Sequence, residues 1–295
     1  MRYVFHLFFL LFIVHCSLFT SSASARADER IVTLSPAINE IVFALGAGEM
    51  VVGTTTYATY PDAAKKLPRV GGYFSPSLER IVALRPTLAI LQGDNTPLAA
   101  KLARLHIDTL SLPIDTLPHI KTAILRIGAR LHKENAAKRI VRDINTALAA
   151  LRKPQENSLR AAPLRILIVI GQPTDLKGRI FVVGHNLYFQ DIIEASGNVN
   201  AVPASVKGQP VFSRENLIAA APDVVIILAP FMRQKHLREK ELIAPWLKLP
   251  IPAAKRGDIY VIGKPYAGIP SHRVVHFIND FGEILDAVAR HQTHR

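Results

Sequence analysis

The sequence contains only one cysteine, Cys16, among its 295 residues. A single thiol excludes an internal disulfide framework and any zinc or iron–sulfur site built from several cysteines. Three motifs of common catalytic sites are also missing: the G-x-S-x-G nucleophile turn, the metal-binding H-E-x-x-H and the phosphate-binding G-x-x-x-x-G-K. We therefore expect no enzyme and no catalytic residues, and keep an exported α/β hydrolase as the alternative from a different functional class.

Acidic residues are scarce, since 23 Asp and Glu stand against 36 Lys and Arg, which gives a formal net charge of +13. The basic residues are spread along the chain, and no sequence pattern of a nucleic-acid-binding module is present. We expect no nucleic-acid partner. The charge favours an anionic ligand or membrane surface, or forms a solvated face without a partner. With 49% hydrophobic residues, the chain is able to bury a full core of one large domain or two medium ones.

Long apolar runs are absent except at the N-terminus. Residues 4–19 are almost wholly apolar and precede small residues spaced as A-x-A at 23–27. This pattern predicts a cleaved signal peptide at 1–27 and an exported, soluble product. A membrane anchor is the alternative, but this apolar run is short for a hydrocarbon core about 30 Å thick. Lipidation would use Cys16, and His15 fits poorly before a lipidated cysteine.

Beyond residue 27, short β-type runs alternate with helical segments, which predicts an α/β fold with a largely parallel sheet. The expected strands are at 30–34, 51–55, 87–91, 108–112 and 164–170, and the expected helices are at 38–45, 78–84 and 98–105. The stretch 117–154 keeps helical spacing without a strand signal, so we expect one long helix there. It would join an N-terminal α/β lobe at 28–116 to a C-terminal α/β lobe at 155–295.

The two expected lobes share a repeated pattern. In each, a glutamate opens an amphipathic helix, a proline follows seven residues later, and a buried strand comes next; the glutamates are Glu79 and Glu215. The helix dipole favours an acid in a first turn, so ordinary helix starts are the simple explanation. The matched spacing instead favours two related lobes.

Three segments together resemble a known family. They read RIVTLSPAINE at 30–40, VGTTTYATYP at 52–61 and VGGYFSPSLE at 70–79. Their order and spacing are similar to those of class III periplasmic substrate-binding proteins of ABC importers, which carry cobalamin, ferric siderophores and haem. The resemblance covers essentially the whole chain after residue 27. It implies two Rossmann-like lobes joined by one long rigid backbone helix, a ligand cleft between the lobes, and a periplasmic monomer that works with an importer permease.

The resemblance also implies which residues contact the ligand and the permease. Ligand contacts come from loops at the strand ends of both lobes, where aromatic rings offer broad apolar faces and a few polar groups fix orientation. The implied ligand-binding residues are Tyr57, Tyr60, Tyr73, Phe74, Gln92, Phe181, Tyr266, His272 and Arg273. Glu79 and Glu215 match the two glutamates that dock onto arginines of the permease.

By the same resemblance the cargo is a metal chelate or a tetrapyrrole, and no resident cofactor is expected. A ferric siderophore comes first, because the tyrosines together with Arg273 and Lys264 suit an anionic chelate. Haem comes next, with Tyr57, Tyr60 or His272 as an axial ligand. Cobalamin follows, because the aromatic positions of the family's cobalamin binder are only partly matched. A nickel or cobalt chelate is a further alternative.

No bare-metal site is expected either. His272, His276 and Asp280 are spaced four residues apart on the predicted last helix, which is a legitimate zinc arrangement, but a third well-placed histidine is missing. Ser271 precedes these residues, and we expect it to be the N-cap of that helix.

Overall fold

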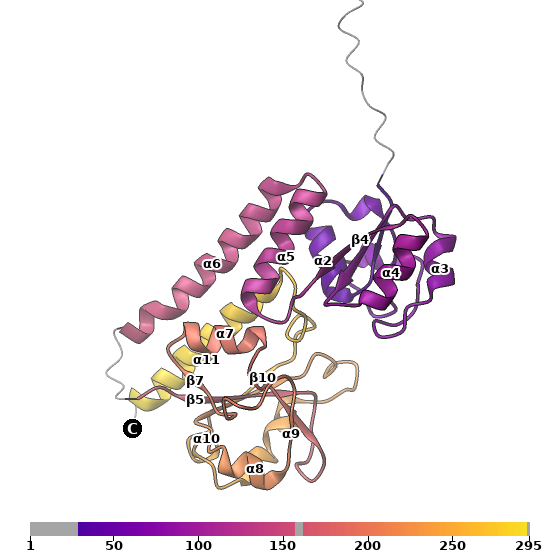
Figure 1. Ribbon diagram of the computed structural model, residues 1–295. Coiled ribbons are helices and arrows are strands. Elements are labelled where there is room, and N and C mark those ends of the chain that lie inside the picture. The colour runs from indigo at the N-terminus through magenta and orange to yellow at the C-terminus, as the bar shows by residue number, and fades with distance from the viewer. Residues whose placement is uncertain (1–28, 157–161, 294–295) are drawn as a thin grey trace, which may run out of the picture.

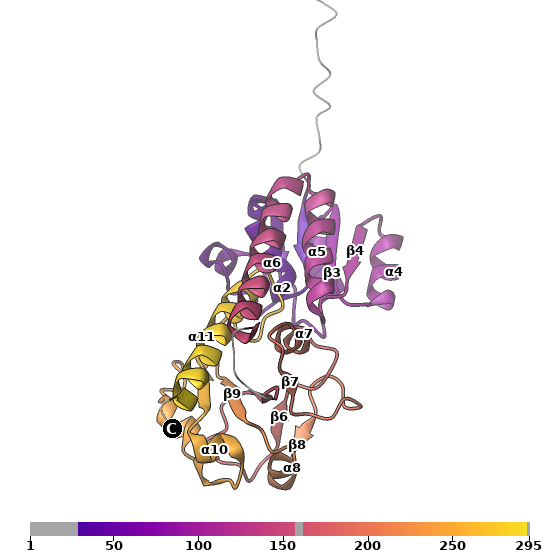
Figure 2. The same cartoon turned by 90° about the vertical axis from the view of Figure 1, so that its left-hand side faces the viewer.

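The computed structural model describes residues 29–156 and 162–293, so the predicted signal peptide at 1–27 lies outside the described residues. Figure 1 shows two lobes, with long helices running along one side of both. In Figure 2, seen from the side of these helices, the N-terminal lobe lies above the C-terminal lobe.

The N-terminal lobe is built on a parallel four-stranded sheet in the order β2-β1-β3-β4. Its elements are β1 (Ile31–Thr33), α2 (Pro36–Ala44), η2 (Gly48–Met50), β2 (Val51–Thr54), η3 (Asp62–Lys66), α3 (Leu78–Ala83), β3 (Leu88–Gln92), α4 (Thr96–Arg104) and β4 (Asp108–Leu112). The Ser35 hydroxyl caps α2 by accepting from the Ile38 N–H at 3.1 Å. The strands and helices predicted for this lobe are confirmed, with small shifts at their ends.

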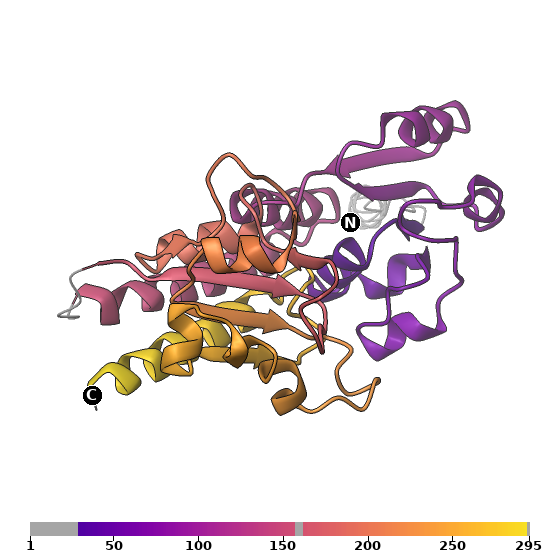
Figure 3. The same ribbon diagram turned by 90° about the horizontal axis from the view of Figure 1, so that it is seen from below.

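The C-terminal lobe contains a mixed sheet in the order β10-β9-β5-β6-β8, with β7 also paired to β5. Its elements are β5 (Arg165–Ile170), β6 (Ile180–Val182), α7 (Tyr188–Ala195), β7 (Val199–Asn200), β8 (Val211–Phe212), α8 (Arg214–Ala219), β9 (Val224–Leu228), α9 (Glu239–Ile243), η4 (Trp246–Lys248), α10 (Pro252–Arg256), β10 (Ile259–Ile262) and α11 (Val274–Thr293). Strands β10, β9 and β5 are parallel. In Figure 3 their arrowheads point toward the side on which the N-terminal lobe lies.

The prediction of one long helix at 117–154 is wrong. The segment forms two helices, α5 (Leu117–Arg130) and α6 (Glu134–Glu156), which pack against each other. Helix α6 also packs on α7 and α11, and its 23 residues span about 35 Å, so this helix runs along both lobes.

A tight turn separates the two helices. His132 adopts a left-handed backbone conformation with φ 55°, and the Lys133 N–H donates to the Gly128 carbonyl at 2.7 Å. Leu131 is buried inside this turn, so the helical spacing of apolar residues continues across it. The turn contains neither glycine nor proline, the usual signals of a helix end, and therefore the sequence pattern did not reveal it.

One hydrophobic cluster extends through both lobes. Because strand side chains alternate between the two faces of a sheet, Ile31 and Ile168 join this shared cluster, whereas Val32 and Leu167 join smaller clusters on the opposite faces. The helices α2, α5, α6, α7 and α11 contribute many of its other members, and further strands of both sheets contribute as well. Across the described ranges, no helix is both long and apolar enough to span a membrane.

Candidate functional site

The residues predicted to bind a ligand fall mainly at the carboxyl ends of the strands. Tyr57 and Tyr60 follow β2, Gln92 ends β3, and Tyr266 and Arg273 follow β10. The structure brings these residues together in two groups, one within the N-terminal lobe and one between the lobes. Tyr57, which is 74% exposed, makes no aromatic or hydrogen-bond contact through its side chain with any residue of 29–156 or 162–293.

The first group lines a hollow in the N-terminal lobe. Tyr73, Phe74 and Gln92 surround about 210 Å³ beside the ends of β1 and β3. The rings of Tyr73 and Phe74 meet edge to face with centroids 4.5 Å apart, and Phe74 is 94% exposed. Burial, with a smaller contribution from the charge of Asp115, raises the pKa of Tyr73, which keeps its hydroxyl protonated. This hollow therefore presents an apolar ring and a neutral phenol to a ligand.

Phe181 is placed differently from the prediction. It was expected in a loop, but it lies in strand β6, directly opposite Ile170 at the end of β5. Its ring is 41% exposed and lies 5.6 Å from the guanidinium carbon of Arg179. The strand pairing fixes Phe181 at the edge of the C-terminal sheet where β5 ends, and the segment with Tyr266 and Arg273 follows β10 of the same sheet.

The second group is centred on an ion pair between the lobes. Arg273 donates from Nε to Oε2 of Glu40 at 2.9 Å, and its Nη2 contacts Oε1 of the same carboxylate. The Ser271 hydroxyl donates to Glu40 Oε2 at 2.6 Å. Glu40 lies on α2 of the N-terminal lobe and is only 2% exposed, while Arg273 is 6% exposed. Arg273 was predicted to face an anionic ligand, but in the structure its guanidinium binds Glu40.

Two tyrosines flank this ion pair. The guanidinium carbon of Arg273 lies 3.9 Å from the ring centre of Tyr60 and 5.9 Å from that of Tyr266. The Tyr266 hydroxyl donates to Asp280 on α11 at 2.7 Å, and burial together with this bond raises the pKa of Tyr266 well above its usual value. Tyr60 remains 44% exposed, so part of its ring is open to solvent beside the junction.

His272 sits between Ser271 and Arg273, before the first residue of α11. Burial, followed by the charges of Arg273 and His276, lowers the pKa of His272 to about 4, so the ring is neutral. Its buried Nδ1 has no hydrogen-bond partner among the described residues. Among the described residues, no three histidine, cysteine or carboxylate side chains form a group able to hold a metal ion.

The prediction for Ser271 is also corrected. Helix α11 begins at Val274, and the Ser271 hydroxyl donates to Glu40 and accepts from the Arg273 N–H at 3.2 Å. Ser271 therefore belongs to the interlobe contact and does not cap the helix.

The two predicted docking acids occupy equivalent positions. Glu79 lies in the first turn of α3 and Glu215 in the first turn of α8, and both are exposed. Ser77 caps α3 and Ser213 caps α8, each accepting a backbone N–H at 3.3 Å. Hydrogen bonding from Ser213 is the main cause that lowers the pKa of Glu215, so its carboxylate stays charged.

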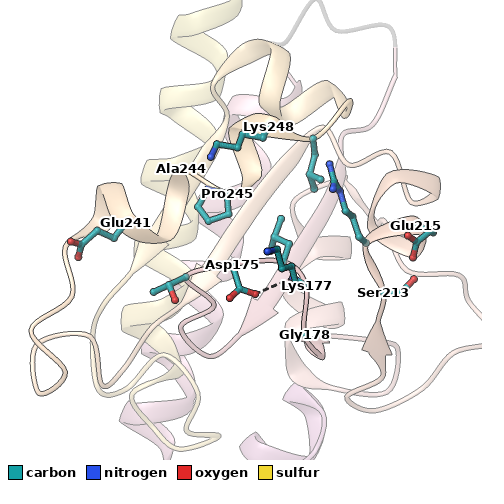
Figure 4. Close-up of a pocket in the computed structure, with 13 residues that line it drawn as sticks. Asp175, Lys177, Gly178, Ser213, Glu215, Glu241, Ala244, Pro245 and Lys248 are labelled. Atoms are coloured by element: carbon teal, nitrogen blue, oxygen red, sulfur yellow. Dashed lines mark hydrogen bonds between the residues drawn. The ribbon is translucent and has the colours of Figure 1, made fainter.

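A separate hollow of about 610 Å³ lies beside Glu215 in the C-terminal lobe. Figure 4 shows Glu215 and Glu241 on opposite sides of it. Its charged lining residues are Asp175, Lys177, Arg214, Glu215, Glu241 and Lys248. Mixed charges and the absence of an aromatic ring from the described lining make this hollow a poorer match for a flat ligand than the aromatic groups at the junction.

Sequence reasoning missed Glu40, the partner of Arg273. Its one signal was the single charged side chain of a largely apolar helix, with Ile38, Ile41 and Val42 around it. A charge in such a setting needs a partner, but spacing along the chain gives no indication of a partner 233 residues away.

Comparison with known proteins agrees with this geometry. A model of the periplasmic binding protein family matches residues 31–266. The vitamin B12-binding protein of Pectobacterium atrosepticum is 28% identical over 211 residues, covering 70% of this chain and 74% of that protein. The vitamin B12-binding protein of Yersinia pestis is 28% identical over 220 residues, covering 69% and 70%.

Solved structures show the same fold. The periplasmic heme-binding protein RhuT from Roseiflexus, in apo form, has 26% sequence identity and a TM-score of 0.71, covering 88% of this chain and 99% of that one. The vitamin B12-binding protein BtuF of Vibrio cholerae, at 21% identity and a TM-score of 0.70 over 88% and 97% of the chains, shares the fold. The class III resemblance and the two-lobed α/β architecture are thus confirmed, and the chain belongs to the periplasmic binding protein family.

Proposed function

We propose that this chain is the substrate-binding component of an ABC importer and that its cargo is a metal tetrapyrrole of the haem or corrinoid kind. The observation that carries the proposal is the set of exposed aromatic side chains at strand ends of both lobes. They are Tyr57, Tyr60 and Phe74 in the N-terminal lobe, and Phe181 and Phe231 in the C-terminal lobe. Exposed rings of this size are costly in water and are typical of surfaces that cover a large flat ligand.

The ion pair between the lobes changes the order of the candidate ligands. The sequence prediction of a ferric siderophore depends on Arg273 and Lys264 facing an anionic chelate. Arg273 is instead buried and neutralised by Glu40. Of these two cations, only Lys264 is exposed. Relatives that bind vitamin B12 and heme add support for a tetrapyrrole. We therefore include a ferric siderophore as the competing ligand in the binding test.

The proposal includes a periplasmic location and docking on the membrane permease through Glu79 and Glu215. Membership of the periplasmic binding protein family supports the location, and the predicted signal peptide at 1–27 would deliver the chain there. The equivalent, exposed positions of the two acids support docking. The proposal assigns binding rather than catalysis, in line with relatives that are binding proteins.

The test is a titration of the purified protein with haemin, cyanocobalamin and a ferric catecholate siderophore by calorimetry, with absorbance recorded in parallel. Heat and absorbance are preferable to tryptophan fluorescence, because Trp246 is fully buried in the C-terminal lobe. We expect one tetrapyrrole to bind with a dissociation constant of about 1 µM or below. Haem bound through a tyrosine or histidine would shift the Soret band.

A pair of variants locates the binding. Phe74→Ser removes a ring of the N-terminal hollow and is expected to weaken binding about tenfold, the effect of losing one well-packed apolar contact. Leu125→Ser is the matched control, because Leu125 is an exposed apolar side chain on α5, away from the strand ends. Tightest binding of the siderophore, or no binding of any of the three compounds, would overturn the tetrapyrrole proposal.

A further inference from the structure

Two adjacent residues of α2 hold opposite ends of Tyr60. Asn39 donates from Nδ2 to the Tyr60 backbone carbonyl at 3.0 Å, and Asn39 is itself held by the Thr33 hydroxyl at 3.1 Å. Glu40, the next residue, binds Arg273, whose guanidinium lies against the Tyr60 ring. The backbone of Tyr60 is thus fixed from within its own lobe, while its ring is fixed from the other lobe.

The Glu40–Arg273 pair is a two-point contact of opposite charges that is nearly free of solvent. The carboxylate of Glu40 accepts three hydrogen bonds, two from Arg273 and one from Ser271. A buried ion pair in which both carboxylate oxygens accept hydrogen bonds is stiff, because any change that separates the partners leaves an uncompensated charge in a low-dielectric site. The pair therefore resists both a shift of the lobes and a rotation of the Arg273 guanidinium.

We propose that Glu40, acting through Arg273, is the positioning residue that presents the Tyr60 ring to the ligand and fixes the separation of the two lobes at the site. One face of the Tyr60 ring is covered by the guanidinium, and the part of this half-exposed residue's ring that is open to solvent forms a preorganised aromatic platform. Preorganisation of such a ring improves affinity because no ordering cost is left for the moment of binding. The role in ligand presentation rests on the function proposed above; the role in lobe separation does not.

The role of Glu40 in ligand presentation is tested by a double-mutant cycle. The quantity measured is the affinity for the tetrapyrrole that binds the wild-type protein. Tyr60→Leu removes the platform, and we expect a tenfold or larger loss of affinity. Glu40→Gln is expected to cause a similar loss alone and little further loss in the Tyr60→Leu background. A purely structural role of Glu40 gives additive losses in the cycle, and that result would overturn the proposal.

The lobe arm needs no ligand. Nitroxide labels are attached through Ala100→Cys on α4 and Ala219→Cys on α8, in a Cys16→Ser background that removes the chain's single native cysteine. We expect double electron–electron resonance to give a narrow distribution of interlobe distances when the Glu40–Arg273 pair is intact. The distribution should be broader in Glu40→Gln. An unchanged distribution in folded Glu40→Gln contradicts the proposal.

A second variant protects the test against misfolding of Glu40→Gln. Arg273→Lys keeps the charge beside Glu40 but loses the planar fork, and it is expected to show the same broadening and the same non-additivity with Tyr60→Leu. Arg256→Lys is the matched control, because Arg256 pairs with Asp223 and Asp258 inside the C-terminal lobe. It should change neither distance nor affinity. If no tetrapyrrole binds the wild-type protein while Glu40→Gln still broadens the distances, the proposed ligand is wrong and the interlobe role of Glu40 stands.

Discussion

The surroundings of His272 disfavour its charged form. Burial is the largest cause, and the charges of Arg273 and His276 add to it, so the pKa falls from 6.5 to about 4. Unfolding restores the ordinary value, and between about pH 6.5 and about pH 4 the unfolded chain therefore binds more protons than the folded one. The stability linked to His272 is fully present above about pH 6.5 and is lost as the pH falls toward about 4.

We therefore predict that His272→Asn weakens the pH dependence of stability. Between about pH 7.5 and about pH 5, the wild-type protein should lose about 2 kcal/mol more unfolding free energy than the variant, measured by urea denaturation. His119→Asn is the control, because His119 is an exposed histidine on α5. Equal acid sensitivity of the His272 variant and the wild type would show that this histidine does not titrate as described.

The candidate site could be predicted from residue type but not from residue pairing. Tyr60, Tyr266 and Arg273 were named from the sequence and meet at the lobe junction. The partner that turns Arg273 away from the ligand is Glu40, which comes from a distant part of the chain and makes a buried contact. Local periodicity describes faces of helices and strands, so it contains no information on such a pair.

At the scale of the elements, the repeat in the two lobes includes an arginine contact that the sequence pattern did not indicate. Arg30, just before β1, donates to the carbonyls of Leu84 and Arg85 at the end of α3. Arg165, at the start of β5, donates in the same way to the carbonyl of Ala220 at the end of α8. In each lobe, an arginine at the first strand thus binds the end of the helix that bears the proposed docking acid. Sequence spacing revealed the acid and the proline, whereas the arginines are separated from them by long intervals.

The α5–α6 pair depends on a close approach that only a glycine allows. A Cβ at Gly128 would lie 2.5 Å from the Cβ of Ala137, well inside normal contact. We predict that Gly128→Ala lowers the unfolding free energy by about 1–3 kcal/mol, the usual cost of overpacking, and that adding Ala137→Gly restores part of it. Thermal or urea unfolding measures both.

Gly178→Ala is the matched control for this prediction, because a Cβ at Gly178 would meet no atom within 4 Å. It should change stability little. A tolerated Gly128→Ala would mean that the helices separate easily, and the interpretation of α5 and α6 as one tightly packed unit would then fail.

At the scale of the whole molecule, the lobes share one hydrophobic cluster as well as the Glu40–Arg273 pair. The sequence prediction attributed rigidity to a single connecting helix. The structure replaces that helix by α5, α6 and α11 packed together, a thicker support for both lobes. We therefore still expect only small lobe movement on ligand binding, for a different physical reason. The two-lobed fold could be predicted because strand and helix periodicities alternate, but the helical pair could not, because its turn carries no breaker residue.

The docking proposal joins both lobes to one partner. Glu79 and Glu215 are exposed, and neither forms an ion pair with a described residue, so their charges are available to arginines of a permease. We predict that Glu79→Ala with Glu215→Ala abolishes uptake of the cargo while its affinity for the isolated protein stays unchanged. Each single substitution should weaken the complex with the permease about tenfold, mostly by slowing association. Uptake by cells and binding to permease in nanodiscs measure the two effects.

Glu134→Ala is the matched control for these acids. Glu134 is also an exposed carboxylate in the first turn of a helix, but it lies at the start of α6, beside the turn between α5 and α6. A general effect of net charge would reduce uptake by the same amount in this variant, whereas docking through two defined points leaves it at the wild-type level. Loss of ligand affinity in the Glu79 and Glu215 variants would instead assign these acids to the ligand site. Because the two acids stand on helices in separate lobes, docking through both requires a fixed lobe separation, so the Glu40–Arg273 pair should also influence the permease complex.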